Sequence, residues 1–150
     1  MTPAIEAARA AGVAFTIHEY EGVDPGEPDY AVAVAAALGI EPARLFKTLL
    51  ASVDGKLQVF VVPADRQLDL RSAGKRAQMA DRAQAERATG YVAGGISPLG
   101  QRRRLPTTVD ETALDHATIL VSAGRRGLQI ELDPRELVRL TDARVASVTR

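Results

Sequence analysis

The apolar positions of this 150-residue chain fall into short stretches bounded by turn residues, which predicts strands alternating with helices. Strict alternation is clearest at 13–20, where Val13, Phe15 and Ile17 share one face. Asp54-Gly55 is a strong hairpin signal, and the segment 124–127 separates a second pair of apolar stretches. The predicted strands are 13–20, 48–53, 57–62, 117–121, 128–132 and 143–149.

Capping residues and prolines predict where the helices begin. Thr2 followed by Pro3 favours a helix that runs to Gly12, and Asp81 with Gln84 resembles a capping box. The other predicted helices are 30–38, a short turn from Pro42, a helix capped by Asp69, and a final helix from Asp133. Strands joined by hairpins and interrupted by helices predict an α+β fold with a mixed, largely antiparallel sheet.

Composition adds the size and charge of the molecule. The length suits one domain, so we predict a single domain over residues 1–150. The net charge is zero, but residues 1–41 carry one base and seven acids, whereas residues 42–109 carry twelve bases and five acids. The positive middle third favours an anionic partner there, and a chance fluctuation on a solvated surface explains it equally well.

Several classes of chemistry lack the residues that they need. The chain contains no cysteine, so it has no disulfide, thiolate metal site or cysteine nucleophile. His18 and His116 have no metal-ligand spacing, and Gly-x-Ser-x-Gly is absent. No apolar run approaches the ~20 residues that span a bilayer, and no secretion signal is visible. We therefore expect a cytoplasmic protein without a metal, a cofactor or a membrane partner.

The Gly-rich segment, residues 89–106, carries the strongest sign of a site. It holds four glycines, two prolines and three consecutive arginines. Gly94 and Gly95 can present successive N–H groups to an anion or a carbonyl oxygen. The segment therefore predicts a site for a carbonyl compound that carries phosphates. Arg102, Arg103 and Arg104 are candidates for phosphate contacts, and a solvated surface run is an equally good explanation.

Three segments together carry a family resemblance: the Gly-rich segment, Phe46-Lys47-Thr48-Leu49-Leu50, and 121–128. They resemble the YbaK-type Cys-tRNA(Pro) deacylases, of the superfamily of the editing domain inserted in bacterial prolyl-tRNA synthetases. The resemblance runs over nearly the whole chain. It implies a barrel-like sheet flanked by helices and an enzyme that hydrolyses mischarged Cys-tRNA(Pro) in trans. It also implies aminoacylated tRNA, chiefly tRNA(Pro), and prolyl-tRNA synthetase as partners.

The resemblance changes how individual residues are interpreted. Lys47 alone would be interpreted as a strand-edge lysine that extends its ammonium to water. In the family, the matching lysine is required for activity, and Gly94 matches a functionally important glycine. The other positions that match the family's pocket are Tyr20, Tyr30, Thr48 and Ser122, with Gly95 beside Gly94. On residue type alone, the tyrosines would be packing residues and Ser122 a strand-end hydroxyl bonded to the backbone.

One pocket position departs from the family. Where the family usually has Gly-Leu-Asp-Ile-Glu-Leu, this chain has Gln129 in place of the aspartate. Gln129 is neutral and of different length, so it leaves open a different target such as alanine. A non-catalytic module that binds tRNA or a nucleotide remains a third possibility.

The resemblance also implies a mechanism that needs no nucleophile from the protein. In the family, the cysteine thiol of the substrate is thought to attack its own ester carbonyl. This matches a chain without cysteine and without an evident serine triad.

Overall fold

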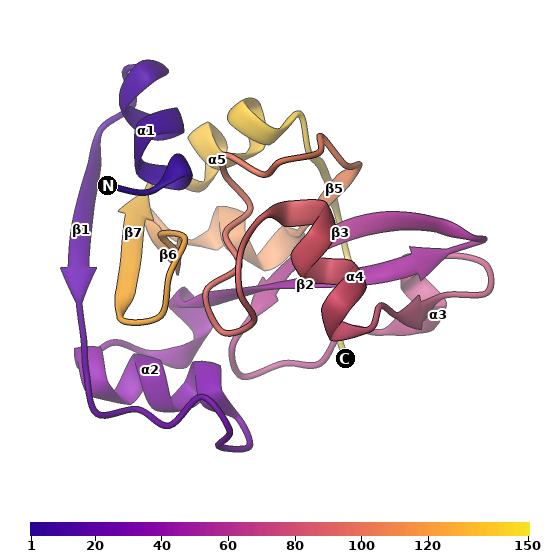
Figure 1. Ribbon diagram of the computed structural model, residues 1–150, viewed down its shortest axis with the longest axis horizontal. Helices are drawn as coiled ribbons and strands as arrows, with labels where there is room; N and C mark the ends of the chain where they lie inside the picture. Colours follow the sequence, from indigo (N-terminus) through magenta and orange to yellow (C-terminus); the bar gives the residue numbers. More distant parts are fainter.

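The computed structural model describes residues 1–150 and arranges the strands in two sheets (Figure 1). The smaller sheet is antiparallel, with the order β1-β7-β6. The larger has the order β4-β2-β3-β5-β8; β4, β2 and β3 are antiparallel, and β5 and β8 join in parallel. The strands are β1 (Phe15–Glu19), β2 (Phe46–Val53), β3 (Lys56–Pro63), β4 (Gln78–Met79), β5 (Thr107–Asp110), β6 (Ile119–Ser122), β7 (Leu128–Leu132) and β8 (Arg144–Ala146).

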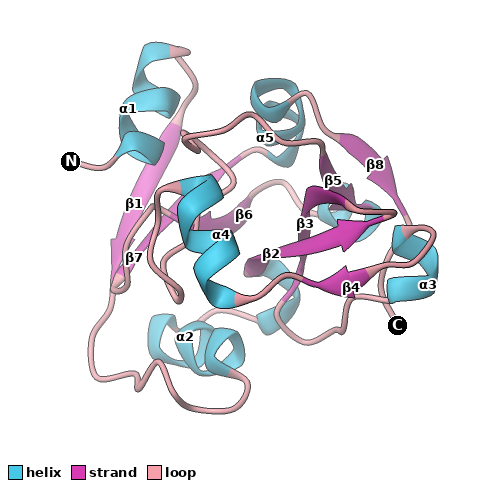
Figure 2. Ribbon diagram, turned by 45° about the vertical axis from the view of Figure 1, so that its right-hand side comes forward, coloured by secondary structure: helices cyan, strands magenta, loops and turns pink.

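Helices lie around these sheets, with α1 and α5 at one end of the molecule and α2 at the other (Figure 2). Their bounds are α1 (Pro3–Ala10), α2 (Tyr30–Leu38), α3 (Leu70–Ala73), α4 (Arg82–Thr89) and α5 (Pro134–Thr141), with short 3-10 turns η1 (Pro42–Arg44) and η2 (Glu111–Asp115). The predicted caps are confirmed, since Thr2 accepts from the Ile5 N–H and Asp81 from the Gln84 N–H. No helix is both long and apolar enough to cross a membrane.

The two sheets meet beside the first residues of β2. Leu45 and Leu120 form an isolated parallel bridge between the segment before β2 and β6. One cluster of buried side chains packs β2, β3, β6 and β7 with α1 and α5. A smaller cluster packs α2 against Leu45, Ala64 and Leu120. The start of β2 is therefore held between α2 and the smaller sheet.

The predicted α+β fold with mostly antiparallel pairing is confirmed, but the barrel-like closure is wrong. The strands form two open sheets, of three and five strands, rather than one closed sheet. β4 and β5 were not predicted from the hydrophobic pattern. All four residues of β5 are buried, yet three of them are polar, which hides the strand from a hydrophobic pattern. Its Asp110 accepts hydrogen bonds from the Val148 N–H and the Thr112 hydroxyl, which compensates for burying a carboxylate.

Candidate active site

A cavity of about 480 Å³ lies where α2, the start of β2, the Gly-rich segment and the β6–β7 hairpin come together. Most of its wall is apolar, including Val34, Leu45 and Ile96. Six of the residues predicted from the sequence line this one cavity: Tyr30, Lys47, Thr48, Gly94, Ser122 and Gln129. They come from five separate segments of the chain, so only the fold brings them together.

Lys47 is the only basic residue in the cavity wall. It lies on β2 opposite Val62, is partly buried, and forms no ion pair or hydrogen bond through its ammonium. Burial lowers the pKa of Lys47, and the carboxylates of Asp29 and Asp65 oppose that effect. An ammonium that is partly desolvated and has no partner is suited to an anionic or strongly polar ligand.

Asp29, the one acidic residue of the wall, was not predicted from the sequence. It precedes α2 in a left-handed conformation, with φ 58°, and its side chain makes no capping hydrogen bond. A non-glycine residue in this region is uncommon, although aspartate tolerates it better than most. The acidic loop 21–29 was visible in the sequence, but nothing indicated that its last residue would face a cavity.

Two polar atoms of the wall are buried without a hydrogen-bond partner, Thr48 Oγ1 and Gln129 Oε1. Gln129 is only 5% exposed. Buried polar groups are nearly always paired, so these atoms indicate a polar ligand that donates a hydrogen bond to Gln129 Oε1 and either donates to or accepts from the Thr48 hydroxyl. The Ser122 hydroxyl accepts from the Gly124 N–H at 3.1 Å, so it combines the predicted backbone contact with a place in the wall.

A hydrogen bond joins the side chains of Tyr20 and Tyr30. Their hydroxyl oxygens are 2.9 Å apart, and burial followed by this hydrogen bond raises the pKa of Tyr30. Tyr30 lines the cavity, whereas Tyr20 lies in an adjoining hollow with Arg125 and Arg126. Tyr20 therefore contacts Tyr30 but does not itself line the cavity.

The glycine pair of the Gly-rich segment offers one backbone donor rather than two. The Gly95 N–H is bonded to the Val92 carbonyl at 2.9 Å, and Gly95 does not line the cavity. The Gly94 N–H has no acceptor in the protein, and Gly94 does line the cavity. The donor role predicted for the pair is therefore open to Gly94 alone.

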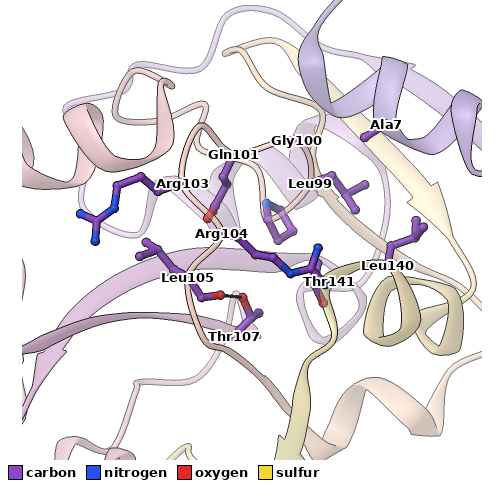
Figure 3. Close-up of a pocket in the computed structure, with 11 residues that line it drawn as sticks. Ala7, Leu99, Gly100, Gln101, Arg103, Arg104, Leu105, Thr107, Leu140 and Thr141 are labelled. Atoms are coloured by element: carbon purple, nitrogen blue, oxygen red, sulfur yellow. Dashed lines mark hydrogen bonds between the residues drawn. The ribbon is translucent and has the colours of Figure 1, made fainter.

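The three consecutive arginines lie outside this cavity. Arg103 and Arg104 line a second cavity of about 260 Å³, together with Gln101 and Thr141 (Figure 3). Figure 3 shows Arg104 extending in the direction of Thr141, while Arg103 points the other way. Arg102 lies against Gly90. All three arginines are exposed and form no ion pair. This arrangement is compatible both with phosphate binding and with a solvated surface run.

The fold is similar to that of two solved structures over nearly the whole chain. A candidate trans-editing enzyme for prolyl-tRNA synthetase is 25% identical, with a TM-score of 0.81 over 100% of this chain and 99% of that chain. A hypothetical protein of known structure is 27% identical, with a TM-score of 0.87 over 99% of both chains.

The chain belongs to the aminoacyl-tRNA editing domain family, whose model matches residues 26–140. A protein of Enterococcus faecalis, bearing the name of a candidate Cys-tRNA(Pro)/Cys-tRNA(Cys) deacylase, EbsC, is 40% identical over 138 residues. The match covers 87% of this chain and 84% of that protein. The family predicted from the three sequence segments is therefore confirmed.

Proposed function

We propose that this chain is a trans-editing aminoacyl-tRNA deacylase that removes cysteine from mischarged Cys-tRNA(Pro). The observation that carries the proposal is the cavity itself, with an unpaired lysine, an unbonded Gly94 N–H and two orphaned polar atoms on an apolar wall. Family membership and the name of the 40% identical relative support the same activity. Such an enzyme is needed because a prolyl site discriminates weakly against an amino acid of similar size.

The cavity suits the aminoacyl end of a charged tRNA. Its volume of about 480 Å³ lies within the usual range for small-ligand sites. The ester carries an α-ammonium, and Gln129 Oε1 is a buried acceptor in need of a donor. In our proposal this ammonium donates to Gln129, and Asp29 provides the compensating negative charge. In the same proposal, the Lys47 ammonium stabilises negative charge on the ester oxygen or on a phosphate.

The chemical step uses the substrate's own thiol. A free thiol has a pKa near ~8.5, so some thiolate is present at neutral pH. Its sulfur forms a bond to the ester carbonyl carbon, the bond from that carbon to the ribose oxygen breaks, and the thiol proton ends on the released ribose hydroxyl. The cyclic cysteine thioester is then opened by water. The protein supplies orientation, which is a large advantage for an intramolecular attack, and a Gly94 N–H for the developing oxyanion.

Recognition of the tRNA body is proposed for the exposed arginines. Arg103 and Arg104 line the second cavity. The Gly-rich segment contributes residues to the walls of both this cavity and the active-site cavity. Phosphates of tRNA(Pro) are the natural ligands for such unpaired guanidinium groups. Prolyl-tRNA synthetase is proposed as the partner that releases the mischarged tRNA.

A panel of tRNA(Pro) charged with cysteine, serine or alanine tests the proposal. Cysteine should be released far faster than serine or alanine, because only cysteine carries a thiol. Comparable release of alanine would show that a water positioned by the enzyme replaces the thiol as nucleophile. It would make this chain an editing enzyme for alanine, the alternative that Gln129 leaves open. Binding of tRNA without release of any amino acid would identify a non-catalytic module.

A further inference from the structure

The peptide unit between Ala93 and Gly94 is held from outside the cavity. Arg126 donates from Nε to the Ala93 carbonyl oxygen at 2.9 Å. The chain contains no cis peptide bond, and in a planar trans peptide the C=O and N–H groups point in opposite directions. A hydrogen bond that fixes the Ala93 oxygen therefore also fixes the direction of the Gly94 N–H.

The Ala93–Gly94 peptide lies in the cavity wall. Ala93 and Gly94 both line the cavity, whereas Arg126 lines the hollow that contains Tyr20 and contacts this peptide from there. The Gly94 N–H points away from the bonded oxygen and has no acceptor within the protein, which leaves it available to a ligand in the cavity. The neighbouring groups are already committed, because the Ala93 N–H donates to Glu86 at 2.7 Å and the Gly95 N–H to Val92.

The hydrogen bond from Arg126 is needed because Gly94 by itself places little restriction on the orientation of this peptide. Its φ is +88°, a conformation that glycine adopts freely, and a glycine peptide can rotate without moving a side chain. Without Arg126, the local chain does little to prevent the Ala93 oxygen from turning into the cavity, where a negative oxyanion would be repelled.

The position of Arg126 is set by the turn 124–127 between β6 and β7, which packs directly on the Gly-rich segment. A Cβ on Gly94 would be 2.7 Å from Arg126 Nε, and a Cβ on Gly95 would be 2.7 Å from Arg125 Cα. The same hairpin carries Ser122 and Gln129 into the cavity wall. One hairpin thus places the substrate-facing side chains and the residue that holds the backbone donor.

We infer that Arg126 is a positioning residue that holds the Ala93–Gly94 peptide with its N–H directed at the substrate carbonyl. This inference rests on the proposed deacylase function. Arg126 forms no ion pair, so its best-defined contact is the one to Ala93. Loss of that contact should weaken stabilisation of the oxyanion and leave binding of the ground-state ester nearly unchanged.

The test compares Arg126→Met with Arg125→Met, with Cys-tRNA(Pro) as substrate. Both variants remove one positive charge from the same exposed turn, but only the first removes the donor to Ala93. Loss of one oxyanion donor lowers kcat by about 100-fold or more, so a disordered donor in Arg126→Met should lower kcat by about tenfold or more. KM should change less than about twofold, because this interaction forms only in the transition state. Arg126→Lys keeps a donor and should recover part of kcat.

Three results would overturn the inference. A raised KM with normal kcat in Arg126→Met would make Arg126 a tRNA phosphate contact. Equal losses of kcat in both variants would show an effect of charge, and a lowered melting temperature confined to Arg126→Met with normal kcat would show a purely structural role.

A readout without substrate separates this inference from the proposed function. The amide resonance of Gly94 in an NMR spectrum should shift or broaden much more in Arg126→Met than in Arg125→Met. If the wild-type protein releases no amino acid, the proposed function fails, and this spectrum still decides whether Arg126 holds the peptide. Equal spectra at Gly94 in the two variants would overturn the inference.

Discussion

Adding a single methyl group at Gly95 should separate the Gly-rich segment from the 124–127 turn. A Cβ at this position would be 2.7 Å from Arg125 Cα, 2.8 Å from Arg125 C and 2.8 Å from Arg126 N. These are backbone atoms, which cannot rotate away as the end of a side chain can. To reach an ordinary contact of 3.4 Å, the two segments must move apart by about 0.7 Å, the difference between that distance and 2.7 Å.

The expected cost follows from the size of this displacement. Overpacking of a well-packed site costs about 1–3 kcal/mol. Replacing glycine by alanine also restricts the unfolded chain, which offsets about 0.4–1 kcal/mol. The net loss of about 1–2 kcal/mol corresponds to a fall in melting temperature of about 2–8 °C for a chain of this size. Deacylation should fall further than stability, since the displacement also draws Ala93 away from Arg126.

Gly26→Ala is the matched control. Neither Gly26 nor Gly95 has a positive φ, and a Cβ on Gly26 meets only Asp24 Oδ1, at an ordinary 3.4 Å. Both substitutions change the unfolded chain alike, so their difference measures the contact in the folded protein. Circular dichroism gives the melting temperature and release of cysteine from Cys-tRNA(Pro) gives the rate. Equal melting temperatures and equal rates for the two variants would refute the packing argument.

Three further outcomes are expected. Lys47→Met should reduce deacylation by about 100-fold or more while the melting temperature holds or rises, because a partly desolvated charge is removed; near-normal rates would remove Lys47 from the site. Replacing Arg103 and Arg104 by glutamine should flatten the salt dependence of tRNA binding by about 0.9 per lost phosphate contact, and an unchanged slope would leave them as surface residues. The Thr118 hydroxyl, then His18 and Arg44, holds the pKa of Glu131 below its ordinary 4.5, so its stabilisation is complete above that pH and is lost as the pH falls through the lowered pKa. Acid unfolding of Glu131→Gln should therefore be less steep than that of the wild type, and identical curves would contradict this linkage.

The hydrophobic pattern determined the local structure because caps, turns and apolar spacing act over a few residues. Asp54-Gly55 shows this well, since both residues adopt the positive φ that a tight hairpin requires. The same pattern could not reveal β5, whose polar side chains are buried by contacts with distant strands. The hydrophobic pattern also could not show whether the sheet closes into a barrel, since closure depends on whether the edge strands pair with each other.

For the site, the sequence determined the residue types and their family, while the tertiary structure decided which of them act together. Lys47, Gly94 and Gln129 were recognisable as pocket residues from segments that resemble one family, and they line one cavity. That Asp29 enters the wall depends on how the end of the acidic loop packs against segments far apart in sequence. Arg126 lies 33 residues from Ala93, and no local pattern encodes that contact. A sequence motif identifies the residues of a site. The direction of the Ala93–Gly94 peptide, by contrast, depends on the packing of the 124–127 turn against the Gly-rich segment.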